Sequence, residues 1–134
     1  MPIQWDDTHS VGVKEIDEQH QHFIRILNKL YESVSHATEQ KELKAILDEL
    51  VAYTDLHFQT EEKYFDKFNY ENSTEHKTEH KKLREQVADF YKKYEEGNAE
   101  ISVDLLDFLE DWLVEHLDGQ DKKYTECFNK NGLF

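Results

Sequence analysis

The stretch His76-Lys77-Thr78-Glu79-His80 contains two histidines four residues apart. In an α-helix, residues with this spacing lie on the same face, one turn from each other. Two neutral imidazoles that point the same way can bind one transition metal. The pair also fits a solvated, charged helix face, so its meaning depends on where the other histidines and carboxylates fall.

The composition describes an acidic chain with few turn residues. Its 134 residues include 16 Lys and Arg against 30 Asp and Glu, a formal net charge of −14, and only 4 Gly and 1 Pro. This length predicts one domain, residues 1–134, with one core. The scarcity of Gly and Pro predicts long helices with few connections. The negative surface repels phosphate backbones and anionic lipid headgroups, so we expect neither a nucleic-acid nor a membrane partner.

Targeting and redox signals are weak. No apolar run approaches the roughly 18 residues of a membrane span, and the first residues do not form a signal peptide, so we expect a cytoplasmic protein. The single cysteine, Cys127, excludes an intrachain disulfide and a cysteine-based metal site. We expect Cys127 to be a buried or half-buried small apolar group.

Apolar residues at three- and four-residue spacing indicate four amphipathic helices. The first runs from about residue 17 to near His36, and the second from residue 43 to around 69. The third is established by His76 and ends at Gly97-Asn98, and the fourth follows a cap at Ser102. Residues 1 to about 15 form an N-terminal arm, and a last helical piece covers 122 to about 128. We therefore predict an all-α fold, an up-down-up-down four-helix bundle with an N-terminal arm and a short C-terminal helix.

Five histidines continue the apolar stripes of these helices, so all five should point into the core. They are His20, His57, His76, His80 and His116. A buried imidazole needs partners for its nitrogens, and five in one small core cannot all be satisfied by chance. Glu61 lies one turn after His57 on the same face. Buried carboxylates beside imidazoles, with no Lys or Arg on the same stripe, indicate bound metal.

A second carboxylate, Asp121, follows His116 by five residues. Five residues of a straight α-helix rotate a side chain by about 500°, which leaves Asp121 about 140° away from the face of His116. Gly119 lies between them, and a break or a π-type widening there would bring Asp121 back to the site.

The predicted donors can be counted against metal coordination. Two octahedral metals have twelve positions, and five imidazoles, two bridging carboxylates and one bridging solvent oxygen would fill eleven. One position would stay open, which by itself makes a binding site.

The order of these motifs resembles the hemerythrin family in its single-domain bacterial form. The motifs are Asp17-x-x-His20, His57-x-x-x-Glu61, His76-x-x-x-His80 and His116-x-x-x-x-Asp121, with Trp5, Ser10-Val11-Gly12-Val13 and Asp121-Lys122-Lys123-Tyr124 also similar to that family. The resemblance implies two iron ions bridged by Glu61, Asp121 and a solvent-derived oxo or hydroxo group. One iron would take His76, His80 and His116. The other would take His20 and His57, and its sixth position would bind dioxygen.

The resemblance also implies an apolar pocket wall around that open position. Its residues would be Phe58, Trp112, Leu113 and Leu117, and Leu117 stands where many members carry Ile. The function expected is reversible dioxygen binding by a monomer, for transport, storage or sensing, without catalysis; no protein partner is indicated.

Three other functions are open from the residues. A di-iron enzyme acting on dioxygen, peroxide or nitric oxide is the main alternative, but ferritin-like enzymes use Glu-x-x-His motifs, which this chain lacks. Iron storage is disfavoured by a closed two-metal site without an acidic channel motif. Structural zinc takes four ligands, and seven are too many.

Overall fold

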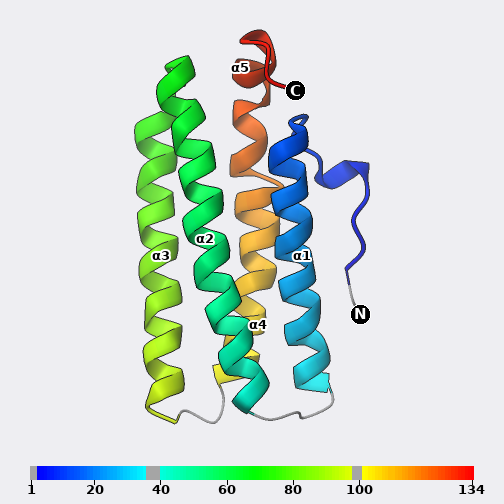
Figure 1. Ribbon diagram of the computed structural model, residues 1–134, viewed down its shortest axis with the longest axis vertical. Coiled ribbons are helices and arrows are strands. Elements are labelled where there is room, and N and C mark those ends of the chain that lie inside the picture. Colours follow the sequence, from blue (N-terminus) through cyan, green and yellow to red (C-terminus); the bar gives the residue numbers. More distant parts are fainter. Residues whose placement is uncertain (1–2, 36–39, 98–100) are drawn as a thin grey trace.

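The computed structural model describes residues 3–35, 40–97 and 101–134, and its main feature is a bundle of four helices. These are α1 (Lys14–Ser35), α2 (Gln40–Phe68), α3 (Ser73–Glu95) and α4 (Ile101–Asp111). Successive helices run in opposite directions (Figure 1), and the described residues contain no strand. The prediction of an all-α, up-down-up-down bundle is confirmed. No helix in these ranges is long and apolar enough to cross a membrane.

The starts of three helices differ from the sequence analysis, and α2 begins at Gln40, three residues before the expected residue 43. α1 begins at Lys14, three residues before the expected start. Lys14 and Glu15 are exposed and add nothing to the apolar pattern, so the pattern did not reveal that the helix includes them. α4 already includes Ser102, so this serine does not precede the helix, and the residue that caps α4 lies outside the described residues. His36 and Asn98 also lie outside them. Gly97, with φ of 78°, follows the end of α3 as expected.

The core has two parts. The larger cluster collects apolar side chains from all four helices. A smaller cluster lies where the N-terminal arm meets the end of the chain, and it contains Val11, Val13, Ile16, Tyr64, Phe65, Tyr70, Tyr124 and Phe128. The candidate site lies among the helices whose side chains form these two clusters.

The N-terminal arm and the C-terminal segment bind each other. The arm contains a 3-10 turn, η1 (Asp7–His9), and passes beside α1 (Figure 1). Nδ1 of His9 lies 3.0 Å from an Asp118 oxygen, and the Thr125 hydroxyl donates to the Val11 carbonyl at 2.6 Å. Trp5 is partly buried against the larger cluster. These contacts join residues more than 100 positions apart at one end of the bundle.

The chain leaves α4 through non-α helical turns. α4 continues as a π-helix, η2 (Trp112–Leu117), then as a 3-10 helix, η3 (Gln120–Tyr124), and ends in α5 (Thr125–Lys130). The Asp118 N–H donates to the Leu113 carbonyl at 2.9 Å, five residues back, which is the hydrogen bond of a π-helix. This stretch therefore advances with less rotation per residue than an α-helix.

Candidate metal centre

The seven residues predicted to form a metal site come together in the middle of the bundle. α1 supplies His20, α2 supplies His57 and Glu61, α3 supplies His76 and His80, η2 supplies His116, and η3 supplies Asp121. All seven are buried, and only His116, at 3%, has any measurable exposure. Helical periodicity therefore predicted the burial of the five histidines and Glu61, whereas Asp121 required the break in the helix near Gly119.

Their donor atoms form two groups that share both carboxylates. One group contains three histidines, His76, His80 and His116, and the other contains two, His20 and His57. Within each group the donor atoms lie within 4.8 Å of one another. We refer below to the three-histidine group and the two-histidine group.

Asp121 faces the two groups with different oxygens. Its Oδ2 lies 2.9 Å from Nε2 of His20, in the two-histidine group. Its Oδ1 lies 2.9 Å from Nε2 of His76 and 3.2 Å from Nε2 of His116, in the three-histidine group. A carboxylate so placed can bind two cations at once.

Glu61 contacts histidines of both groups as well. Its Oε1 lies 2.9 Å from Nε2 of His80 and 3.3 Å from Nε2 of His57, so it also reaches both groups. Its second oxygen, Oε2, is buried without a hydrogen-bond partner among the described residues.

Several other buried polar atoms of the cluster lack a hydrogen-bond partner within the described part of the chain. They are Nδ1 of His20, Nε2 of His57, both ring nitrogens of His76 and His116, and Oδ1 of Asp121. An orphaned buried polar atom is costly, and so many in one place call for a bound partner. Imidazole nitrogens with carboxylate oxygens are a donor set that suits iron and similar transition metals. The cluster is therefore suited to a metal site.

The electrostatics of the cluster also favour a bound cation. Burial alone would raise the pKa of Glu61 and Asp121, but the surrounding histidines hold both well below their usual range. Burial alone would lower the pKa of His76, but the nearby carboxylates of Asp121 and Glu61 outweigh it and raise the pKa to about 10. A proton on His76 thus takes the place of positive charge that a metal would supply.

The expected widening of the helix before Asp121 is present. The π-turn lies at Trp112–Leu117, slightly before Gly119, and Gly119 then makes the turn into η3. A Cβ on Gly119 would lie 2.6 Å from the Glu115 carbonyl oxygen, so only glycine allows the chain to pass here. The five-residue spacing from His116 to Asp121 is thereby accommodated.

The four residues expected to wall a pocket, Phe58, Trp112, Leu113 and Leu117, are all buried. Phe58 stacks on the His80 ring at a centroid distance of 3.9 Å, and Trp112 contacts the His116 ring edge-on at 6.4 Å. Phe58 also lies 5.9 Å from the His57 ring, so it adjoins both groups, whereas Trp112 adjoins the three-histidine group.

Sequence reasoning missed the side chains that contact the outer nitrogens of two histidines. Nδ1 of His57 lies 2.7 Å from the Gln19 amide oxygen, and Nδ1 of His80 lies 2.8 Å from a Glu62 oxygen. Each of these partners adjoins a predicted ligand in sequence, His20 or Glu61. Since neighbouring helix residues point about 100° apart, the neighbour of a core residue can face the next helix. The positions of Gln19 and Glu62 next to predicted ligands were therefore the sequence signal that could have identified them.

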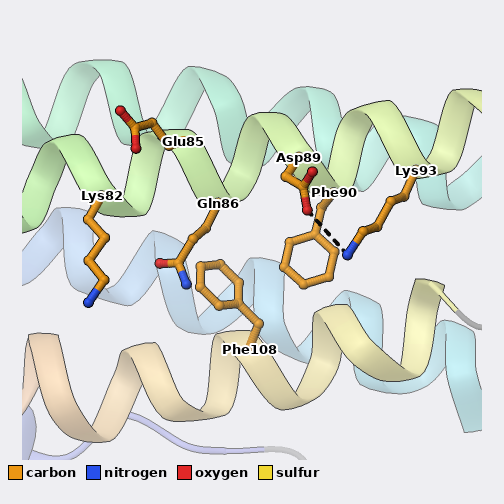
Figure 2. Close-up of a pocket in the computed structure, with 7 residues that line it drawn as sticks. All are labelled: Lys82, Glu85, Gln86, Asp89, Phe90, Lys93 and Phe108. Carbon is orange, nitrogen blue, oxygen red and sulfur yellow. Dashed lines mark ion pairs between the residues drawn. The ribbon is translucent and has the colours of Figure 1, made fainter.

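Two hollows lie between α3 and α4. Figure 2 shows a surface cleft of about 400 Å³, whose floor is formed by Phe90 and Phe108 and whose rim carries the Asp89–Lys93 ion pair at 3.2 Å. A smaller cavity of about 170 Å³ shares Phe108 with it and extends to His116. The cleft itself contains none of the predicted ligands.

Fold and site together define an all-helical protein with a buried cluster of histidines and carboxylates that is suited to bind metal. A model of the hemerythrin HHE cation binding domain matches residues 11–127, and this chain belongs to the hemerythrin family. It is 36% identical over 113 residues to a bacteriohemerythrin of Methylococcus capsulatus, covering 84% of this chain and 86% of the relative. It is 38% identical to a hemerythrin-like protein of Naegleria gruberi, over 92% and 91% of the two chains. A crystal structure of a wild-type hemerythrin superposes with a TM-score of 0.85 at 35% identity, covering 95% of this chain and 98% of that one.

Proposed function

We propose that this protein binds dioxygen reversibly at a centre of two iron ions. His76, His80 and His116 would hold one iron, and His20 and His57 the other, with Glu61 and Asp121 shared between them. A solvent-derived oxo or hydroxo group would complete the bridge. When bound, ferrous iron supplies the electrons and the open coordination position that dioxygen needs.

The observation that carries this proposal is the unequal size of the two groups. Both share the same two carboxylates, but one has three imidazoles and the other two. With equal coordination numbers, the metal of the two-histidine group has one position more for an exogenous ligand. A small diatomic molecule suits a position that is surrounded by buried side chains.

The chain's own residues support binding without further chemistry. Phe58, Trp112, Leu113 and Leu117 are buried apolar or aromatic side chains that would keep bulk water from the centre. Tyr53 stacks on the His57 ring at 5.2 Å, and burial raises the pKa of its phenol well above the usual value. Tyr53 therefore stays neutral near pH 7 and provides no general base.

The test begins with metal analysis and one pair of spectra. Protein produced with ample iron should contain close to two equivalents. Its reduced, colourless form should gain a visible absorption band on exposure to oxygen and lose it on degassing. One equivalent, or zinc instead of iron, would contradict the proposal.

A second experiment, the consumption of an added reductant in air, separates the proposal from a di-iron enzyme. An oxygen carrier should consume no added reductant in air beyond its own slow autoxidation, whereas an enzyme should turn reductant over steadily with dioxygen, peroxide or nitric oxide. Steady turnover of the reductant would show that the protein is a di-iron enzyme and not an oxygen carrier.

We further propose that the protein works as a monomer. Its exposed large apolar side chains, Val51, Leu56, Val103, Val114 and Phe134, come from several elements, and single exposed apolar residues are normal on a monomer's surface. Sedimentation of the iron-loaded protein at increasing concentration should give a constant mass near 16.1 kDa.

A further inference from the structure

We propose that Gln19 and Glu62 are positioning residues that fix the orientation of one histidine in each group and give the two halves of the centre unequal charge. The inference rests on the proposed metal centre, but not on its use for dioxygen. It concerns the outer ring nitrogens, those that face away from the site.

The contacts of Gln19 determine which nitrogen of His57 carries the proton. The Thr60 hydroxyl donates its one hydrogen to the Leu56 carbonyl at 2.9 Å, so its oxygen must accept from the Gln19 amide NH₂ at 3.0 Å. The Gln19 carbonyl oxygen is then the atom 2.7 Å from Nδ1 of His57. Nδ1 must donate to it.

This chain of hydrogen bonds prepares His57 for a metal. A neutral imidazole with its proton on Nδ1 has its lone pair on Nε2, and Nε2 is the atom that faces Glu61 and Asp121. α1 thus supplies both a predicted ligand, His20, and the side chain that orients a ligand on α2. The whole relay is electrically neutral.

Glu62 does the same for His80, but with a charged group. Its Oε2 lies 2.8 Å from Nδ1 of His80, whose Nε2 lies 2.9 Å from Glu61. The His80 side chain is fully buried, whereas the carboxylate side chain of Glu62 is 27% exposed and remains in contact with solvent. A carboxylate partner makes an imidazole a stronger donor than an amide partner does.

The two halves should therefore differ in how well they stabilise a higher metal charge. The three-histidine group has an anion behind His80 and favours the ferric state. The two-histidine group has a neutral amide behind His57 and is easier to keep ferrous, which suits the half proposed to bind an exogenous molecule.

Metal affinity provides the first experiment. Co²⁺, whose absorption reports coordination without oxygen, is titrated into the metal-free forms of the parent, Gln19→Leu and Glu62→Leu. We expect each variant to bind roughly 10–100-fold more weakly, the usual effect of removing an outer partner of a ligand. The control is Glu18→Gln, because Glu18 is exposed beside Gln19 and should leave affinity unchanged.

Reduction potential provides the second experiment and tests the charge directly. Gln19→Glu keeps the acceptor and adds a charge, so the potential of the iron-loaded centre should fall. Glu62→Gln keeps the acceptor and removes a charge, so the potential should rise. Glu18→Gln makes the same charge change as Glu62→Gln, but at an exposed site, and should shift the reduction potential much less.

Opposite shifts in the two variants support the proposal, since a merely structural role would not depend on the sign of the charge. Shifts of one sign, or shifts no larger than that of Glu18→Gln, overturn it. If Gln19→Leu or Glu62→Leu fails to fold, the reduction potentials of Gln19→Glu and Glu62→Gln still test the proposal. Because neither measurement uses dioxygen, a parent protein that binds two metals but no oxygen would refute the proposed function alone.

Discussion

Glu61 reaches histidines of both groups with one and the same oxygen, Oε1. Replacing Glu61 by Gln keeps the shape of the side chain but removes the charge that a second metal requires. We expect the Glu61→Gln protein to contain fewer than two irons and to show no oxygen-dependent band, as measured by metal analysis and absorption. An unchanged spectrum would refute the bridging role. Glu75→Gln, an exposed change on α3, serves as the control.

Leu113 is a buried residue at the start of the π-turn and is 5% exposed. Leu113→Ala would leave a cavity of a few methylene groups, so the free energy of unfolding should fall by roughly 2–5 kcal/mol. Metal content should stay the same because no proposed ligand changes. If Leu113 keeps water from the centre, the oxygen-bound form should convert faster to a ferric form that no longer binds oxygen.

The neighbouring residue provides the control for that variant. Val114 is 65% exposed, so Val114→Ala should change stability by no more than about 0.5 kcal/mol and leave the autoxidation rate unaltered. A Leu113→Ala protein with normal metal content and the parental autoxidation rate would show that Leu113 does not guard the site.

Among the elements, η2 and the turn at Gly119 decide where Asp121 lies. A Cβ at this position would lie 2.6 Å from the Glu115 carbonyl oxygen, so Gly119→Ala must displace the backbone two residues before Asp121. We expect a loss of roughly 1–3 kcal/mol in unfolding free energy together with lower metal content. Gln120→Ala adds no Cβ and should preserve the metal. Equal metal content in both variants would show that Asp121 tolerates the shift.

The helices were predictable because their apolar residues repeat at helical spacing, and the five histidines fall on the same stripes. The break before Asp121 was also predictable, since five residues cannot be spanned by a straight α-helix without losing the shared face. The place of the widening was not, because the π-turn at Trp112–Leu117 depends on backbone hydrogen bonds that have no side-chain signature. Gln19 and Glu62 were missed because each acts across to another helix, and periodicity describes only one helix at a time.

At the scale of the whole molecule, the cluster couples stability to pH and to metal. In the metal-free protein, protonated His76 has a pKa of about 10 against a usual value of 6.5, so its stabilising effect is complete below pH 6.5 and is lost as pH rises towards 10. Burial lowers the pKa of His116 to about 4, so its effect is present above pH 6.5 and is lost as pH falls towards 4. We expect the melting temperature of the metal-free protein to be highest near pH 6.5.

Bound metal should remove the loss of stability that the metal-free protein shows as the pH rises above 6.5. Bound cations replace the proton on His76, so the stabilisation by iron should grow between pH 6.5 and 9.5, while acid should release the metal as protons compete for the imidazoles. Melting curves of both forms, recorded anaerobically across this range, measure the difference. A metal-free protein that became more stable from pH 7 to 9 would contradict the assignment.

Asp121 lies in η3, beyond the four long helices, and it is part of a C-terminal segment that the N-terminal arm also holds through His9 and Thr125. Metal bound at Asp121 would fasten this segment to the bundle, and its removal would leave the segment to open more readily than the helices. The exposed Lys122 and Lys123 should then become accessible to trypsin. Limited digestion should therefore cut the metal-free protein first near residue 122 and spare the loaded one, so that the length of the surviving fragment reports from outside whether the centre is filled.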